Sequence, residues 1–351
     1  MNCVIKVNSS EKLGSGHFIR CFNLGQALRN KDFDVTFIYN TLMHQHEEML
    51  KLNYFKYHKI SNLGDFAKPE SKNILYSISI LGYSSIDWFV LDDYESDANW
   101  DPNILSICRN LLVIEDLHQH QRACHLLLDM NYRTEESKKR ISALYESTET
   151  LIGPMFALLD NRYAKLHSSQ PSEMEVRTHE ILIYFGSQDL NSLTIESLSV
   201  LRERFPSIHC KVVLLSNNPD LETVSEFVRE NSGQFQLFVD PEFLGEIMEE
   251  CTISIGAGGI SLWERMSLNL YCIAVATAEN QVSPLQELAA DGLITYLGLA
   301  ENFSNLALYQ ALSAVVDDES EYGKYLEKNR SISDGRGCER VVELMLKGAD
   351  R

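Results

Sequence analysis

Leu13-Gly14-Ser15-Gly16-His17-Phe18-Ile19-Arg20 is the stretch of sequence that decides the fold. An apolar run at 3–7 precedes it, and apolar residues at helical spacing, beginning with Phe18 and Phe22, follow it. This order of strand, glycine turn and helix is typical of open α/β folds, which bind ligands at the carboxyl edge of a parallel sheet. The pattern therefore predicts His17 in the first turn of a helix at that edge.

The histidine in this turn has two interpretations. Imidazole can act as a general base near neutral pH, and a helix N-terminus disfavours its cationic form. The same residues also fit a tight turn at Gly14 and Gly16, in which His17 only caps the helix or packs against it. The stretch by itself favours neither interpretation.

Short apolar runs alternate with helical patterns along the whole chain, which predicts an α/β protein with parallel sheets. We predict two Rossmann-like domains facing across a cleft. Residues 1–165 form the N-terminal domain with the candidate base, and residues 178–351 form a C-terminal nucleotide-binding domain. The sequence does not decide which half the last helix, near 338–346, packs on. The predicted strands are 3–7, 35–39, 88–91, 111–114, 126–128, 181–185, 211–215, 236–239, 252–255, 272–276 and 294–296, with a polar linker at 167–173.

The charge of the chain restricts its partners. Its 351 residues carry 31 basic and 50 acidic side chains, a net charge of −19. Such a surface repels nucleic-acid phosphates and anionic lipid headgroups, so we expect no nucleic-acid partner and no docking on a membrane. The sequence has neither a run of 18 apolar residues nor a secretory signal, so we expect no membrane insertion and a cytoplasmic location.

Cysteine and histidine usage favours neither disulfides nor a metal. The eight cysteines form no C-x-x-C pair and mostly lie in apolar patterns, where a thiol behaves as a small core residue. One polar loop does gather possible ligands, but it shows no helical i, i+4 pair of the kind that supports a metal site. We therefore expect neither a metal nor a cofactor. The ligand types in that loop are Glu115, Asp116, His118, His120 and His125.

A second glycine turn lies in the other half, where residues 255–265 read I-G-A-G-G-I-S-L-W-E-R. Glycines let a backbone approach a ligand closely, and the N–H groups of a helix N-terminus suit a diphosphate. These features indicate a nucleotide site at Ala257, Gly258 and Gly259, with Glu264 one turn further on and able to accept from ribose hydroxyls. The run departs from G-x-G-x-x-G and fits equally a plain strand–helix turn with a solvated Glu264.

Three more polar clusters follow predicted strands. Asn280 and Gln281 offer carboxamides suited to sugar hydroxyls or acetamido groups, although Asn280 also fits a helix N-cap. The pair Asp92-Asp93 either binds a metal or is solvated, and a further cluster occupies 185–189, which contains Gly186. Because every cluster follows a strand, all of them can face one cleft.

Taken together, these segments resemble a known family. G-S-G-H-F-I-R-C at 14–21 resembles the G-x-G-H-x-x-R-C segment of the UDP-sugar hydrolases of pseudaminic acid biosynthesis. The similarity continues in unbroken order over nearly the whole chain. Its further parts are D-D-Y at 92–94, E-D-L at 115–117, L-L-D-M-N at 127–131, G-P-M-F-A-L-L at 153–159, the segment 255–264, A-E-N-Q at 278–281 and D-G-R-G at 334–337.

The resemblance implies a fold, a reaction and site residues. Members of that family have the GT-B architecture and hydrolyse UDP-2,4-diacetamido-2,4,6-trideoxy-β-L-altropyranose to the free sugar and UDP without a metal. It implies that His17 activates the attacking water, that a UDP-sugar is the ligand, and that other enzymes of the pathway are possible partners. The implied substrate-binding residues are Gly16, Arg20, Tyr94, Asn280 and Gln281, and the implied nucleotide-binding residues are Gly186, Ala257, Gly258, Gly259 and Glu264.

The sequence also departs from the family's pattern. Lys6 and Asn8 stand where the family carries arginine and an acidic residue, and F-G-S-Q-D at 185–189 replaces F-G-G-S/T-D. The identity of the sugar is therefore less constrained than the reaction class. A GT-B glycosyltransferase acting on a soluble acceptor is the alternative, and a binding protein without catalysis is a third hypothesis that the retention of His17 disfavours.

Overall fold

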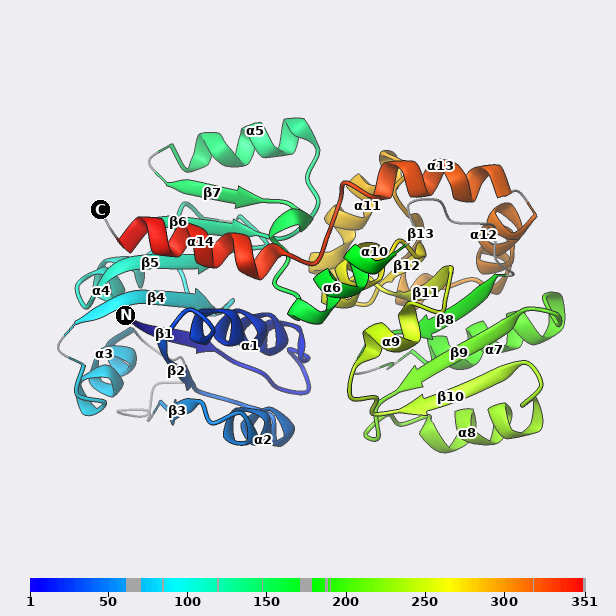
Figure 1. Cartoon of the computed structure of the whole chain (residues 1–351), viewed down its shortest axis with the longest axis horizontal. Helices are drawn as coiled ribbons and strands as arrows, with labels where there is room; N and C mark the ends of the chain where they lie inside the picture. Colours follow the sequence, from blue (N-terminus) through cyan, green and yellow to red (C-terminus); the bar gives the residue numbers. More distant parts are fainter. Residues whose placement is uncertain are drawn as a thin grey trace. The chain divides into compact units, whose positions relative to one another are not determined.

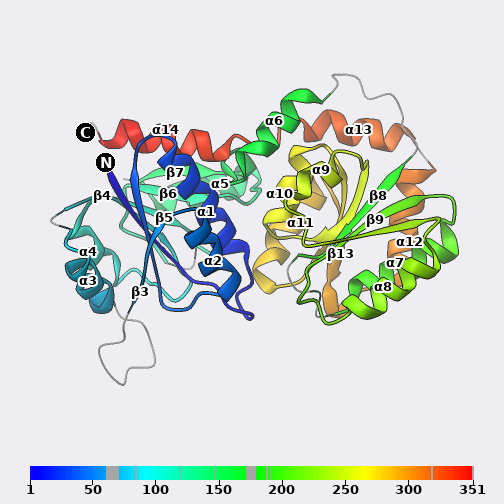
Figure 2. The same cartoon turned by 60° about the horizontal axis from the view of Figure 1, so that its bottom comes forward.

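A computed structural model describes residues 1–60, 71–83, 85–118, 120–146, 148–170, 179–186, 189, 191–317 and 319–349. The chain divides into two compact units, one made of Met1–Leu159 with Arg336–Arg351 and the other of Asp160–Gly335. Each unit contains one parallel sheet with helices on both faces, as Figures 1 and 2 show. The prediction of two Rossmann-like α/β units is confirmed.

The first unit is built around β1 (Asn2–Val7), which is buried from Cys3 onward. Its described strands lie in the order β3-β2-β1-β4-β5-β6-β7, and every pair is parallel. The order reverses between β1 and β4, the switch point at which open α/β sheets bind ligands. The other strands are β2 (Asp34–Tyr39), β3 (Lys56–Lys59), β4 (Ile86–Asp92), β5 (Cys108–Ile114), β6 (Leu126–Asp129) and β7 (Glu149–Ile152).

The helices of this unit cover both faces of its sheet. Apolar side chains of α3, α4 and α5 pack in one core with the strands, whereas α1 packs beside α14 (Figure 1). The indole N–H of Trp88 in β4 donates to the carbonyl of Met345 in α14 at 3.1 Å, which joins the end of the chain to the first sheet. The helices are α1 (Gly16–Arg29), α2 (His44–Leu52), α3 (Ser71–Ile80), α4 (Asp101–Leu105), α5 (Glu135–Leu144), η1 (Pro154–Phe156) and α14 (Gly337–Ala349).

The second unit repeats this plan with the order β10-β9-β8-β11-β12-β13, and its switch point lies between β8 and β11. Figure 2 shows α7, α8 and α12 on one face of its sheet and α9, α10 and α11 on the other. Its strands are β8 (Glu180–Tyr184), β9 (His209–Leu214), β10 (Phe235–Val239), β11 (Ile253–Ala257), β12 (Tyr271–Ala276) and β13 (Thr295–Leu299). Its helices are α6 (Asn161–Ser169), α7 (Leu193–Arg204), α8 (Leu221–Glu230), α9 (Leu244–Met248), α10 (Ile260–Ser267), η2 (Glu279–Gln281), α11 (Val282–Ala290), η3 (Ala300–Asn302), α12 (Asn305–Val316) and α13 (Glu319–Asn329).

The strands expected from apolar runs are present, and two more were missed. Both β3 and β7 lie at the edges of the first sheet, and their residues, K-Y-H-K and E-T-L-I, leave several side chains partly or fully exposed. An edge strand is covered less than a central one, so it needs no continuous apolar run.

The limits of the two units differ from those expected. Residues 336–351 belong to the first unit instead of the second, and α6 already belongs to the second. The expected linker at 167–173 is helical through Ser169, and its residues 171–173 lie outside the described residues. The chain returns to the first unit between two glycines that pack closely against other backbone. An added Cβ on Gly335 would meet the backbone of Ala164, and one on Gly337 would meet the carbonyl of Ala157. Within the described residues, no helix combines the length and apolar character needed to cross a bilayer.

Candidate functional site

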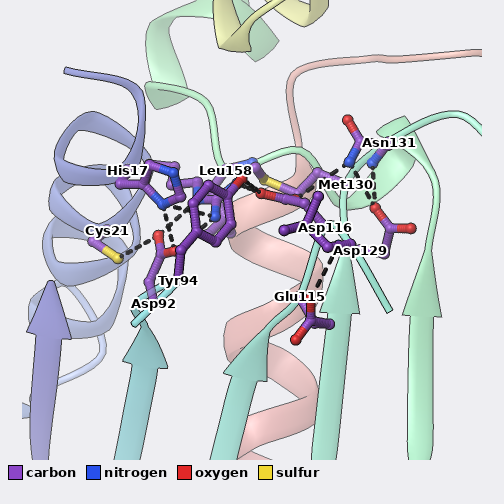
Figure 3. A network of polar contacts seen from close by, with 12 residues as sticks. His17, Cys21, Asp92, Tyr94, Glu115, Asp116, Asp129, Met130, Asn131 and Leu158 are labelled. Atoms are coloured by element: carbon purple, nitrogen blue, oxygen red, sulfur yellow. Dashed lines mark hydrogen bonds and ion pairs between the residues drawn. The ribbon is translucent and has the colours of Figure 1, made fainter. Parts of the chain in front are cut away.

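The first predicted site residue, His17, lies in the first turn of α1 and contacts a carboxylate at the end of β4. Its Nδ1 is 2.6 Å from Oδ1 of Asp92, and its side chain is 13% exposed (Figure 3). An ionised carboxylate only accepts hydrogen bonds, so this short contact favours a proton on Nδ1 over the longer contact of 3.1 Å from Nη2 of Arg20 to the same nitrogen. The other ring nitrogen, Nε2, has no partner among the described residues and is left as the basic atom.

Asp92 is fully buried and receives several hydrogen bonds. Arg20, one turn after His17 on α1, donates to it from Nε and Nη2 at 2.6 Å each, and the thiol of Cys21 donates at 3.3 Å. Burial alone would raise the pKa of Asp92, but the charges of Arg20 and His17 outweigh that effect and hold the pKa well below its usual range. The carboxylate is therefore ionised and able to stabilise a positive charge on His17.

Arg20 also joins a second carboxylate to this group. Its Nη1 donates to Asp116, which follows β5, at 2.9 and 3.2 Å, and Tyr94 donates its hydroxyl to the same carboxylate at 2.6 Å. The edge of the Tyr94 ring packs on His17 with the ring centroids 4.4 Å apart (Figure 3). Burial raises the pKa of the Tyr94 hydroxyl, and the charge of Asp116 raises it further, so this group stays a donor.

The predicted residues of the first unit are thus brought together, with corrected contacts. Gly16 begins α1, and His17, Arg20 and Tyr94 lie in one network. The guanidinium of Arg20 is buried between two aspartates and contacts both of them, and its Nη2 also lies 3.1 Å from Nδ1 of His17. The sequence did not single out Asp92 as the partner of His17. The spacing of His17 and Arg20 could have located it, because that spacing puts both side chains on one side of α1, facing the end of the neighbouring strand.

The second acid of the pair, Asp93, contacts a different residue. Buried Lys6 donates from Nζ to its Oδ2 at 2.7 Å, and Asn8 donates to the same oxygen at 3.2 Å. These are the two positions at which β1 departs from the family's pattern. Asp93, which directly follows β4, therefore forms a buried ion pair with Lys6 of β1.

The residues of the histidine-rich loop also contact different partners. Glu115 accepts from two backbone N–H groups, His118 contacts Asp129 at 2.9 Å, and His125 accepts from the backbone N–H of Leu111. Within the described residues, no group of three or more histidine, cysteine or acidic side chains is placed to hold a metal ion.

In the second unit, the glycine turn joins β11 to α10 at the switch point. The N–H of Gly258 is already bonded to the carbonyl of Val275 at 3.1 Å, and an added Cβ there would lie 2.5 Å from Leu285. At Gly259 the nearest atom to such a Cβ is Nε2 of Gln281, at 3.7 Å. Gly258 therefore packs against α11, whereas Gly259 has space beside it.

Glu264 is half-buried and is hydrogen-bonded to Tyr163 of α6. Burial raises the pKa of Glu264 to about 7, although the hydrogen bond from Tyr163 and the charge of Arg265 act in the opposite direction. A carboxyl with this pKa changes its protonation state in the neutral range, unlike an ordinary solvated glutamate.

The remaining predicted residues lie at the carboxyl ends of β8 and β12, the two strands that flank β11 in this sheet. Gly186 follows β8 with φ of 91°, and Asn280 and Gln281 form η2 after β12. Gln281 accepts from the backbone N–H of Thr277 at 2.9 Å. In the cluster at 185–189, Ser187 and Gln188 lie outside the described residues. Asp189 caps α7 by accepting from the N–H groups of Leu193 and Thr194.

Comparisons with known proteins find distant relatives and a shared fold. No family model matches the chain. It is 24% identical over 209 residues to the spore coat polysaccharide biosynthesis protein SpsG of Bacillus subtilis, covering 58% of this chain and 60% of that protein. It is 20% identical over 285 residues to an uncharacterised protein of Methanocaldococcus jannaschii, covering 80% of this chain and 57% of that protein. The chain thus spans less than two thirds of either relative.

Solved structures similar to this chain share its fold over nearly its full length. MurG of Acinetobacter baumannii matches with a TM-score of 0.66 and 13% identity, covering 99% of this chain and all of that one. UDP-GlcNAc 2-epimerase of Neisseria meningitidis, bound to UDP-GlcNAc, matches with a TM-score of 0.62 and 15% identity, again over 99% and 100%. A UDP-glucosyltransferase of Polygonum tinctorium matches with a TM-score of 0.66 and 11% identity over 98% of each chain. The chain therefore has the fold of GT-B glycosyltransferases, with two parallel-sheet Rossmann-like units.

Proposed function

We propose that this chain is a hydrolase that cleaves the glycosidic C–O bond of a UDP-linked diacetamido-trideoxy sugar, releasing the free sugar and UDP. The observation that carries the proposal is the contact of His17 with Asp92 at the switch point of the first sheet. A histidine that only capped its helix would not need a buried carboxylate on Nδ1 while its Nε2 has no partner among the residues that the structure describes. That arrangement suits a general base.

The reaction needs few groups from the protein. Nε2 of His17 takes a proton from water, the water oxygen bonds to the anomeric carbon, and the bond from that carbon to the diphosphate oxygen breaks. The bonding electrons leave with UDP, which departs as a stabilised anion and so needs little acid assistance. The ionised Asp92, held by Arg20, stabilises the imidazolium that forms.

Roles in the second unit follow from the positions of its residues at the carboxyl edge of the sheet. Gly259 has space beside it for a diphosphate, and the first N–H groups of α10 suit that anion. Glu264 accepts from the ribose hydroxyls, and Gly186 adds room at the end of β8. Asn280 and Gln281 contact the sugar with their carboxamides. In the first unit, Gly16 and Tyr94 border the sugar near His17, and Arg20 acts by holding the two aspartates.

The substrate and the cellular setting come from the family resemblance. It supports a place in pseudaminic acid biosynthesis, reaction without a metal, a cytoplasmic location and possible contact with other enzymes of the pathway. The alternative is a glycosyltransferase on a soluble acceptor, which the same fold in MurG and the plant glucosyltransferase keeps open. In that case a sugar hydroxyl replaces water at His17.

One assay separates these proposals. The protein is incubated with UDP-2,4-diacetamido-2,4,6-trideoxy-β-L-altropyranose, and UDP release is followed with and without a chelator. Release without any acceptor, unchanged by the chelator, is the expected result. Release only when an acceptor sugar is present would favour the transferase, and no release under either condition would contradict both.

A further inference from the structure

Arg265 is a fully buried arginine in α10, directly behind the glycine turn of the second unit. It is 0% exposed and ranks among the largest fully buried side chains of the described residues. Its Nε donates to the carbonyl of Ser261 at 3.1 Å, its Nη2 to the carbonyl of Ala257, and its Nη1 lies 3.5 Å from the hydroxyl of Ser254. The guanidinium therefore bridges the last residue of β11 and the first turn of α10.

The charge of this arginine lacks the partner that other buried arginines have. Arg20, Arg122 and Arg133 each contact a buried aspartate at 2.6 to 2.7 Å, but no ion pair of Arg265 exists within the described residues. The neighbouring Glu264 is instead hydrogen-bonded to Tyr163. Buried charges are nearly always paired, because removing an ion from water is costly. Glu264 and Arg265 interact electrostatically, but the guanidinium itself is held only by carbonyl and hydroxyl oxygens and forms no ion pair within the described residues.

The turn in front of Arg265 is shaped to receive such an anion. Arg265 donates to the carbonyl oxygens of Ala257 and Ser261, which lie on either side of the two glycines. Both oxygens are therefore directed toward the guanidinium. The N–H groups of Gly259, Ile260 and Ser261 have no acceptor within the part of the chain that the structure describes. Gly256 leaves room for this arrangement, since a Cβ there would lie 2.8 Å from Nη1 of Arg265.

We propose that Arg265 is a positioning residue for the diphosphate of the nucleotide: it fixes the carbonyls of the glycine turn away from the ligand and places behind the turn a positive charge that forms no ion pair within the described residues. This inference rests on the proposed function, in that the ligand is a UDP-sugar. The phosphate charge is the counter-charge of Arg265, reached through the N–H groups of the turn and not by direct contact. Binding of the nucleoside part of the ligand does not depend on Arg265.

The test measures the dissociation constants of UDP and of uridine by calorimetry for the full chain and three variants. Arg265→Met removes the charge and the bridge, and Arg265→Lys keeps only the charge. Arg122→Met removes another buried arginine, in the first unit, and serves as the control. We expect Arg265→Met to weaken UDP binding by about tenfold or more, with uridine binding changed by less than about twofold. Arg265→Lys recovers part of the loss, and the control leaves both constants unchanged.

Other outcomes separate the inference from the proposed function. Parallel weakening of UDP and uridine in the Arg265 variants would mean a merely structural role and overturn the inference, as would unchanged UDP binding. Should Arg265→Met fail to fold, Arg265→Lys and Ser254→Ala provide the same comparison of UDP with uridine. UDP binding that depends on Arg265, together with no UDP release in the assay above, would support this inference and contradict the hydrolase. Absence of UDP binding by the unmodified protein would overturn both.

Discussion

Nδ1 of His17 lies 2.6 Å from the buried carboxylate of Asp92, although 75 residues separate them in the chain. The two meet because β1 and β4 are neighbours in the sheet, and α1 begins where β1 ends. Asp92 is in turn held by Arg20 from the same helix. The orientation and tautomer of the histidine are thereby fixed by groups that need not touch a substrate.

Asp92→Asn should strongly reduce turnover while leaving substrate binding nearly intact. The asparagine cannot stabilise the imidazolium and can present its amide to Nδ1, which favours the wrong tautomer. We expect kcat for UDP release to fall about 10²- to 10⁴-fold, with KM changed little. Steady-state kinetics on the UDP-linked diacetamido sugar measure both values.

Asp93→Asn is the matched control, because the two acids are adjacent but contact different residues. It leaves Lys6 buried without a full countercharge, so the free energy of unfolding should fall by about 3 kcal/mol, measured in urea. Its kcat should stay within about tenfold of the unmodified protein. Equal losses of kcat in both variants would contradict the specific role of Asp92.

His17→Ala should retain UDP and lose catalysis. The side chain removed is the proposed base, whereas the nucleotide contacts belong to the second unit. We expect UDP affinity within about twofold and a loss of turnover of about 10²-fold or more. Calorimetry and the UDP-release assay test the two parts, and a variant with the unmodified rate would show that another group activates water.

Replacements of Tyr94 separate its hydroxyl from its ring. Tyr94→Phe removes the hydroxyl that donates to Asp116 and keeps the ring, so we expect a loss of about 1 kcal/mol in stability and a kcat within about tenfold. Tyr94→Ala also removes the ring that packs on His17, and its kcat should fall clearly further. If Phe and Ala variants had the same kcat, contact of the ring with His17 would have no role in catalysis.

Glu264 should make nucleotide binding dependent on pH near neutrality. Burial raises its pKa to about 7, so the carboxylate that accepts from ribose prevails above pH 7 and is lost as the pH falls below it. UDP affinity should therefore decrease by up to about tenfold per pH unit below 7, relative to Glu264→Gln measured at the same pH. Titration of the UDP phosphate is common to both proteins and cancels in this ratio, so a ratio independent of pH would contradict the assignment.

The two glycines of the second turn should respond differently to a methyl group. In Gly258→Ala the new Cβ meets Leu285, which should destabilise the fold by about 1–3 kcal/mol, and Leu285→Ala should relieve part of that loss. Gly259→Ala has space, so its stability should be unchanged while UDP affinity falls about tenfold. Thermal unfolding and calorimetry distinguish the two, and full UDP affinity in Gly259→Ala would place the diphosphate elsewhere.

Most of the fold was predictable from the sequence because strands covered on both faces must be apolar. Runs such as 3–7 and 272–276 satisfy that requirement and form β1 and β12. The edge strands β3 and β7 need not be apolar, because their side chains are partly exposed, and they were therefore not predicted. The position of α14 was also not predicted, because an amphipathic helix can cover either sheet. Its contact with Trp88, which assigns it to the first sheet, is visible only in the structure.

The site was predictable in its residue types but not in its pairings. Glycine turns after apolar strands located His17 and Gly259. Which of two adjacent aspartates faces His17 depends on the alternation of side chains across a strand and on its register with β1. The buried cation Arg265 gave no signal either, because in sequence it is only the charged neighbour of Glu264.

The return of the chain to its first sheet has a consequence for synthesis on the ribosome. Residues 160–335 are contiguous and leave the ribosome as a complete unit, whereas the first unit still lacks α14 at that stage. Until Met345 emerges, the indole of Trp88 has no carbonyl to donate to and one flank of α1 stays uncovered. The unit that contains Met1–Leu159 is therefore completed only after Asp160–Gly335 has been synthesised, when α14 covers the flank of α1.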